Sequence, residues 1–350
     1  MNTVTVNASG KYDVLIGANI LQQIGAFVTT IRSNCRAAII SDTNVWPHYG
    51  AIVENSLSAT GIQTCHFVFT AGEASKNGYT YLEILSFLAE NRITRSDIII
   101  ALGGGVVGDI AGFTAATYLR GISYIQIPTS LLAMVDSSVG GKTAIDLPAG
   151  KNLAGAFMQP SLVLCDVAAL NTLPADFFLD GCAEVIKYGV LYDSDLIDYL
   201  LETGPAFDRE SVITKCVSYK RDVVQADEFD TGMRQKLNLG HTIGHGIEAI
   251  SNYRISHGQS VATGMAVVTK AAVHNGMCKD EVYKKLITVL KLFSLPITTD
   301  YSAAALYQSA LSDKKRSGDS VNLIIPRTIG NCDIVPTSVT ELESFIEAGL

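Results

Sequence analysis

Three of the chain's six histidines lie in a single short stretch, LNLGHTIGHGIEAISNYRISHGQ, residues 237–259. They are His241, His245 and His257. Imidazole changes its charge near neutral pH and binds divalent metal ions when it is neutral. Histidines gathered in this way suit proton transfer or metal binding, so this stretch is the first candidate for a functional site.

A helix beginning near Leu239 would gather part of this cluster on one face. At 100° per residue, His241, His245 and Glu248 would fall within about 60° of one another. Such a helix would present its imidazoles to a cleft, and the alternative is a polar surface helix with a coincidental pair of histidines. The opposite face would be apolar, with Ile243, Ile247 and Ile250.

A catalytic metal site usually takes three protein ligands and leaves one position open, so two histidines do not complete it. A carboxylate candidate occurs in GCAEVIKYG (181–189), where Glu184 stands within an otherwise apolar helical segment. Burying a carboxylate without a partner is costly. A simple ion pair with Lys187, one turn later, would also satisfy Glu184 and would imply no metal.

Positively charged side chains near these motifs would suit a phosphate or carboxylate on a substrate. Lys220 lies in the middle of an apolar helical stripe, which favours an amine aimed into a cleft, although it could also extend along that surface to water. Arg234 and Asn238 directly precede the predicted histidine helix. A further group in the first half, which could equally be solvated surface, consists of Arg120, Lys142, Lys151 and Asn152.

A glycine-rich turn follows a predicted strand in SDIIIALGGGVVGDIAGFTAA (96–116). Gly103-x-Gly105-x-x-Gly108 lies between this strand and a predicted helix, where backbone amides and the helix dipole can hold a pyrophosphate. The acidic residue expected about 20 positions later is missing. Asp42, at the end of an earlier strand, could bind an adenosine ribose instead. We predict an unusual dinucleotide site, and the alternative is a plain tight turn.

SSVGGKTAID (137–146) contains Gly141-Lys142-Thr143, the end of a P-loop pattern. That pattern needs a glycine five residues before Gly141, where this chain has Asp136, and no predicted strand leads into the segment. Both features argue against a nucleotide-hydrolysing P-loop.

The composition of the chain limits the classes of protein to which it can belong. With 350 residues and 48% hydrophobic side chains, the sequence suits a globular protein of two domains. Without a leader-like segment or a long apolar run, we expect a cytoplasmic protein. Seven scattered cysteines without a CxxC pair indicate reduced thiols and argue against a cysteine-built zinc site. A net charge of −8 makes nucleic acid and anionic membrane poor partners.

Short β-branched runs alternate with helical segments such as NGYTYLEILSFLAENR (77–92) in the first half. This alternation predicts an α/β domain with a parallel sheet and crossover helices. The predicted strands are RAAIISD (36–42), TCHFVFT (64–70), SDIIIAL (96–102), ISYIQIPTS (122–130) and SLVLCD (161–166).

From about Asn171 the strand signal fades, and the second half is predicted to be mainly α-helical, interrupted by VNLIIP (321–326). We therefore expect an α/β domain at 1–170, with the glycine turn, and a mainly helical metal- and substrate-binding domain at 171–350. A small-molecule site is expected in the cleft where two such halves meet.

Blocks of sequence resemble the 3-dehydroquinate synthase family, in the same order from about residue 42 to residue 330. The resemblance implies an N-terminal NAD-binding α/β domain, a helical C-terminal domain and a homodimer. It also implies conversion of 3-deoxy-D-arabino-heptulosonate 7-phosphate to 3-dehydroquinate and phosphate, with NAD and zinc or cobalt as cofactors. The blocks are GEASK (72–76), GGGVVGD (103–109), YLRG (118–121), DSSVGGKTAID (136–146), GKNLAGAF (150–157), GCAEVIKYG (181–189), LNLGHTIGHGIEA (237–249), HGQSVATGM (257–265) and SDKKRSG (312–318).

By motif position, the resemblance implies that Glu184, His241 and His257 are the metal ligands and that His245 is an active-site group near the metal. Asp230 stands where the family often has a glutamate that acts as acid or base. Together with Asp42, the residues expected near NAD are Glu73, Lys76, Gly105, Val106, Val107, Gly108, Asp109, Thr129, Ser130, Lys142, Lys151 and Thr172. Those expected around the substrate are Arg120, Asp136, Lys142, Asn152, Lys187, Lys220, Arg234, Asn238, His245 and a lysine of Lys314-Lys315.

The chain departs from the family pattern at two places. Asp176 and Phe177, in LPADFF (173–178), stand in place of an expected Arg-Glu pair, and Gln259 replaces a usual glutamate.

One alternative function is that of another sugar-phosphate cyclase, which Arg234 and Asn238 disfavour. A polyol dehydrogenase of similar fold would need no phosphate-binding lysines. The third alternative is a non-catalytic nucleotide-binding domain, which is disfavoured because the chain has every expected ligand position.

Overall fold

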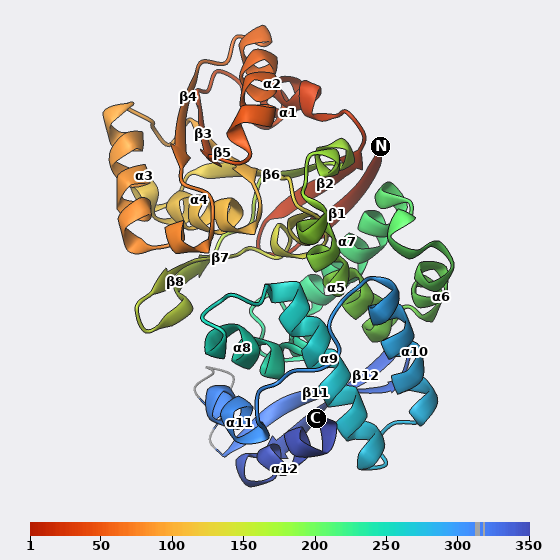
Figure 1. Cartoon of the computed structure of the whole chain (residues 1–350). Coiled ribbons are helices and arrows are strands. Elements are labelled where there is room, and N and C mark those ends of the chain that lie inside the picture. Colours follow the sequence, from red (N-terminus) through yellow and green to blue (C-terminus); the bar gives the residue numbers. More distant parts are fainter. Residues whose placement is uncertain (312–315, 318) are drawn as a thin grey trace. The chain divides into compact units, whose positions relative to one another are not determined.

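The structure is a computed structural model that describes residues 1–311, 316–317 and 319–350 (Figure 1). The described residues form two compact units. Unit 1 comprises Met1–Pro174 and Arg209–Phe229, and unit 2 comprises Ala175–Asp208 and the described part of Asp230–Leu350.

Unit 1 is built on a seven-stranded sheet with the strand order β1-β2-β9-β6-β5-β3-β4. β1 and β2 pair antiparallel, and the other neighbours in this sheet pair in parallel. The predicted parallel α/β domain is confirmed, and each predicted strand is present. The bounds are β1 (Asn2–Asn7), β2 (Lys11–Gly17), β3 (Ala37–Asp42), β4 (Thr64–Phe69), β5 (Ile98–Gly103), β6 (Ser123–Pro128) and β9 (Leu162–Asp166).

The central strand β5 is apolar along its whole length because helices cover both faces of the sheet. Successive side chains of a strand point to opposite faces. Ile98, Ile100 and Leu102 share a core with residues of α1 (Ile24–Ile31) and α2 (Trp46–Ala59). Ile99 and Ala101 share another with residues of α3 (Gly78–Glu90) and α4 (Gly105–Thr117), which Figure 1 shows beside the same strands. No face of β5 is left for polar residues, as is usual in parallel sheets.

A separate two-stranded hairpin, β7 (Lys142–Leu147) with β8 (Gly150–Phe157), holds the segment with the partial P-loop pattern. Gly141 has φ +71, a left-handed conformation that glycine adopts without strain. The chain then enters a strand where a P-loop would begin a helix, so this segment does not have the structure of a P-loop. β7 packs on α4, where a Cβ at Gly112 would lie 2.4 Å from Thr143.

Helix α7 (Arg209–Ala226) belongs to unit 1, although residues on both sides of it in sequence belong to unit 2. It packs along β1, and its end is fixed by Glu228, which accepts hydrogen bonds from Ser9 N at 2.7 Å and Gln159 Nε2 at 2.8 Å. The predicted domain boundary between residues 170 and 171 stays a prediction. The compact units depart from that division mainly because α7 belongs to unit 1.

Unit 2 is mainly helical, as predicted, and also contains a small antiparallel sheet of β10, β11 and β12. The sequence predicts the middle strand of this sheet, but β12 is not predicted. Ile243 and Ile247 of α8 lie in the unit's core with Leu323 of β11. The bounds are α5 (Ala175–Tyr192), α6 (Ser194–Thr203), α8 (His241–Ile250), α9 (His257–His274), α10 (Asp280–Leu292), α11 (Ala303–Leu311), α12 (Val339–Gly349), β10 (Arg316–Ser317), β11 (Ser320–Thr328) and β12 (Asn331–Ser338). Within the described ranges, no helix has the length and apolar character of a membrane span.

Glycines allow α9 to contact both α5 and α8 backbone to backbone. A Cβ at Gly264 of α9 would lie 2.0 Å from the carbonyl oxygen of Gly240, which directly precedes α8. A Cβ at Gly258 of α9 would lie 2.0 Å from the carbonyl oxygen of Asp180 on α5. Side chains at these positions would push the three helices apart.

We predict that Gly264→Ala destabilises the protein by about 1–3 kcal/mol, because the added methyl group overpacks a contact between two backbones. Chemical unfolding followed by circular dichroism measures this change. The matched control is Gly78→Ala, since Gly78 begins α3 and has open space where its Cβ would be. Equal unfolding free energies for the two variants would contradict the packing argument.

Candidate functional site

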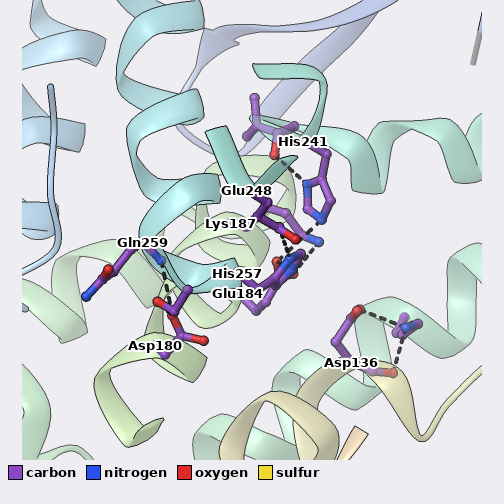
Figure 2. Close-up of polar contacts among 11 residues, drawn as sticks. Asp136, Asp180, Glu184, Lys187, His241, Glu248, His257 and Gln259 are labelled. Carbon is purple, nitrogen blue, oxygen red and sulfur yellow. Dashed lines mark hydrogen bonds and ion pairs between the residues drawn. The ribbon is translucent and has the colours of Figure 1, made fainter. Parts of the chain in front are cut away.

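Glu184, His241 and His257 converge in unit 2 from three helices (Figure 2). His257 Nε2 lies 3.3 Å and His241 Nε2 3.6 Å from Oε1 of Glu184. One ligand atom from each residue lies within 4.8 Å of the other two, so the group could hold a metal ion. Glu184 is completely buried, while the histidines remain partly accessible.

Both histidines are the first residues of their helices, and local structure fixes where each helix begins. Gly240 has φ +78, a left-handed conformation that turns the chain from the 3-10 helix η7 (Met233–Asn238) into α8 at His241. For α9, Asp180 of α5 accepts hydrogen bonds from Ser256 Oγ and, at 3.1 Å, from the backbone N–H of Gln259. Asp180 lies one turn before Glu184, so α5 both supplies a ligand candidate and anchors the helix that carries another.

The second ring nitrogen of each histidine also has a defined partner. His241 Nδ1 lies 3.0 Å from the carbonyl oxygen of Leu239, and His257 Nδ1 lies 2.8 Å from Oε1 of Glu248. A carbonyl oxygen can only accept, so Nδ1 of His241 carries the proton and Nε2 offers its lone pair when the ring is neutral. Figure 2 shows the ring of His241 directed in this way.

Two imidazole nitrogens and one carboxylate oxygen are the donor set of many catalytic zinc sites, and cobalt accepts the same ligands. Lys187 forms an ion pair with Oε2 of Glu184, which leaves Oε1 facing the two imidazoles. The residues present therefore fit a divalent metal ion. An overlapping group of His245, Glu248 and His257 meets the same distance condition, and within it Glu248 is already hydrogen-bonded to His257.

The glycine turn of unit 1 has the predicted strand–turn–helix form. β5 ends at Gly103 and α4 begins at Gly105, so the first backbone amides of α4 lie at the end of the sheet. A Cβ at Gly108 would lie 2.7 Å from Oε1 of Gln126, and one at Gly105 would lie 3.2 Å from Oγ of Ser137. A helix N-terminus that begins with glycine fits the pyrophosphate of a dinucleotide.

Polar residues of unit 1 form a charged cluster beside this turn. Nζ of Lys76 lies 2.5 Å from Asp109 and donates a hydrogen bond to Asn152 at 2.6 Å. Burial raises the pKa of the Asp109 carboxyl, and the Lys76 ammonium opposes this shift. Lys151 Nζ lies 3.3 Å from Glu73.

Comparisons with known proteins agree with these features. The family models of the 3-dehydroquinate synthase N-terminal and C-terminal domains match residues 66–180 and 181–316. The chain belongs to the 3-dehydroquinate synthase family. The 3-dehydroquinate synthase of Clostridium acetobutylicum is 45% identical over 342 residues, which are 96% of each chain. That of Enterococcus faecalis is 43% identical over 350 residues, 98% of each chain.

Solved structures of similar fold include other sugar-phosphate cyclases. A 2-epi-5-epi-valiolone synthase from Streptomyces hygroscopicus, with NAD+ and Zn2+ bound, is 25% identical with a TM-score of 0.89, covering 99% of this chain and 98% of that one. A 2-deoxy-scyllo-inosose synthase complexed with carbaglucose-6-phosphate, NAD+ and Co2+ also has a TM-score of 0.89, over 100% of both chains. At 23% identity, the latter likeness concerns the fold alone.

Other 3-dehydroquinate synthase positions expected near NAD are distributed along the same end of the sheet in unit 1. Thr129, directly after β6, donates its backbone N–H to the carbonyl of Gly103 at 3.0 Å. Thr172 contacts the hydroxyl of Tyr49 at 2.6 Å. Asp42, at the end of β3, accepts backbone hydrogen bonds from Asn44 and Val45. These placements are compatible with the predicted roles, which stay predictions.

Among the positions expected around the substrate, Lys220 and Asp136 lie together in unit 1. Lys220 Nζ lies 2.7 Å from Oδ1 of Asp136 and also donates to its carbonyl oxygen at 2.6 Å. Arg120 is not near them. Arg95, just before β5, donates to the carbonyl of Leu119, which places Arg120 at the end of the sheet opposite Gly103.

The remaining described substrate positions of unit 2 precede α8 or lie within it. Arg234 is buried in η7, which ends at Asn238, and Asp230 has φ +60. The ring of His245 lies 5.3 Å from that of His241. Lys142 begins β7 of unit 1 and is exposed. Lys314 and Lys315 lie outside the described residues.

The structure adds Asp180 and Ser256 to the residues that sequence reasoning found. Gln259 can stand in place of the family's glutamate without loss of the contact between α9 and Asp180. The contact from Gln259 to Asp180 uses the backbone N–H, which any residue other than proline supplies.

His257 has an unusual pKa in the metal-free site. Burial alone would lower it, but hydrogen bonds to Glu184 and Glu248, with the charges of both carboxylates, raise the pKa to about 10. His257 is then an imidazolium at neutral pH when no metal is bound. A metal ion can use Nε2 only after this ring has lost a proton.

We predict that zinc binding at pH 7 releases about one proton from His257 per metal ion. Because the folded-state pKa is about 10, above the usual 6.5, this release should persist from pH 7 to pH 9 and diminish as the pH approaches 10. Calorimetric titrations in two buffers of different ionisation enthalpy measure the released protons. His245→Ala serves as the control and should retain the release, and a binding enthalpy independent of buffer would refute the assignment.

Proposed function

We propose that this chain is a 3-dehydroquinate synthase, which converts 3-deoxy-D-arabino-heptulosonate 7-phosphate to 3-dehydroquinate and phosphate. The observation that carries this proposal is the likeness to curated 3-dehydroquinate synthases over nearly the whole chain, 45% identity over 96% of it in one case. The convergence of Glu184, His241 and His257 supports it, because this reaction uses a divalent metal as well as NAD.

The proposed cofactors are NAD, at the Gly103–Asp109 turn, and Zn2+ or Co2+, at Glu184, His241 and His257. When bound, NAD accepts and returns a hydride, and the metal ion polarises substrate hydroxyl groups. The amides at the start of α4 would hold the pyrophosphate, and Asp42 would orient the adenosine ribose. Lys187 would keep one oxygen of Glu184 engaged, so that the other stays directed toward the histidines.

The substrate carries both a phosphate and a carboxylate, and cationic side chains of this chain would bind them. Lys142, Lys187, Lys220 and Arg234 are the proposed anion-binding groups, with a lysine of Lys314-Lys315 as a further family position. The place of Arg120, at the end of the sheet opposite Gly103, does not support the same role for it. Asp136 would orient Lys220, to which it is hydrogen-bonded. His245 and Asp230 would transfer protons near the reacting carbons.

A homodimer, implied by the family resemblance, and a cytoplasmic location, expected from the sequence, also stay part of this proposal. Another sugar-phosphate cyclase is the second candidate, because solved cyclases of that kind share the fold at a TM-score of 0.89.

A turnover experiment separates a cyclase from a dehydrogenase. We expect zinc-loaded protein with NAD at a small fraction of the substrate to release phosphate and 3-dehydroquinate together, far beyond the NAD supplied. The reason is that the hydride taken from the substrate is returned within the same turnover. No NADH absorbance should persist. Phosphate assays, liquid chromatography and absorbance at the NADH band provide the measurements.

Two variants control the turnover experiment. His257→Ala should lose both metal and activity, whereas His245→Ala should keep the metal and lose rate. A halt once NAD is consumed, with NADH equal to product, would instead indicate a dehydrogenase. Turnover of another sugar phosphate in preference to the proposed substrate would indicate another cyclase.

The glycine turn has its own test. In Gly105→Val, branched methyl groups would occupy the start of α4, where even an added Cβ would lie 3.2 Å from Ser137 Oγ. We expect NAD to bind about tenfold more weakly or worse, a loss of at least about 1.4 kcal/mol. Calorimetric titration of the folded variant measures this. Zinc binding, which uses unit 2, should be unchanged, and wild-type NAD affinity would remove the turn from the proposal.

A further inference from the structure

We propose that Glu248 is a positioning residue for the metal centre, holding the ring of His257 so that Nε2 is the nitrogen offered to the metal ion. This inference rests on the proposed metal ligands Glu184, His241 and His257. It concerns a residue that touches neither the metal ion nor the substrate in that assignment.

The contact that carries the proposal is buried and direct. Oε1 of Glu248 lies 2.8 Å from Nδ1 of His257, and the Glu248 side chain is 5% exposed. On the other side of the ring, Nε2 lies 3.3 Å from Oε1 of Glu184. A carboxylate can only accept at Nδ1, so the proton is held there and the lone pair of the neutral ring is at Nε2.

The loop between α8 and α9 brings the two residues together. Ser251 Oγ donates to the carbonyl of Glu248 at 2.9 Å and accepts from the backbone N–H of Ile255 at 3.3 Å. Asn252 and Tyr253 have φ +52 and +58. A left-handed conformation costs free energy for a tyrosine, so the surrounding contacts must enforce the turn that returns the chain to Glu248.

The two histidines are consequently held by different partners. His241 Nδ1 contacts a neutral backbone carbonyl, whereas His257 Nδ1 contacts a carboxylate. A carboxylate partner orients an imidazole more firmly and makes it a better electron donor to a metal ion. The partner of His241 is a backbone carbonyl, which no side-chain substitution removes. The partner of His257 is the side chain of Glu248, which a substitution can remove.

The test compares metal affinities of Glu248→Ala and Glu248→Gln with wild type. We expect Glu248→Ala to weaken zinc binding by about 10–100-fold, the range seen when the outer partner of a metal-binding histidine is lost. Glu248→Gln should fall between the two, because its amide oxygen still accepts from Nδ1 but carries no charge. Competition with a chromophoric chelator measures the dissociation constants, without any assay of activity.

Glu54 supplies a matched control. Its Oε1 lies 2.9 Å from Nδ1 of His66, which makes an analogous Glu–His contact at the surface of unit 1. Glu54→Ala should leave zinc affinity unchanged. If Glu248→Ala binds zinc as tightly as Glu54→Ala, the proposal is wrong. If instead His257→Ala keeps its zinc, the ligand set itself is wrong, and the two failures are thus distinguishable.

A second measurement does not depend on whether the alanine variant folds. Nitrogen-15 labelling of the chain's six histidines allows the protonated ring nitrogen of His257 to be identified by NMR in zinc-loaded wild-type protein. We expect a proton on Nδ1 and metal at Nε2. Metal at Nδ1 would overturn the proposal directly.

Discussion

The buried carboxylate of Glu184 is the constraint on which the rest of unit 2 depends. A charge removed from water must be compensated nearby, because leaving it unpaired costs several kcal/mol. Lys187 on the same helix reaches one oxygen, and His241 and His257 lie close to the other. The histidines come from different helices, so α8 and α9 must begin next to α5. Gly240, Gly258 and Gly264 permit this because no Cβ separates the backbones.

Sequence periodicity predicted the elements whose signal is local. The strands β3, β5, β6 and β9 are apolar runs because they are buried on both faces, and α8 carries its isoleucines on the core side as predicted. The hairpin β7–β8 was not predicted, because its small residues have little alternation and its packing on α4 decides its structure. β1 and β2 were missed although NTVTVN alternates, so the signal was present there.

The residues of the candidate site also divide into those with a local sequence signal and those without one. Helical spacing alone placed His241, His245 and Glu248 on one face, but it could not choose the third ligand, since Glu184 and His257 are 73 residues apart. The family resemblance made that choice. Asp180 was beyond both kinds of reasoning, because its contacts to Ser256 and to a backbone N–H depend on how two helices meet.

The charges of this centre explain why it suits an anionic substrate. In the metal-free protein, the carboxylates of Glu184 and Glu248 are balanced by the Lys187 ammonium and the His257 imidazolium. A divalent ion that displaces the His257 proton adds two positive charges and removes one. These four groups with the metal then carry one net positive charge in a largely buried site. A negatively charged oxygen of the substrate or of a transition state would restore neutrality, so the proposed centre would stabilise charge that develops during the reaction.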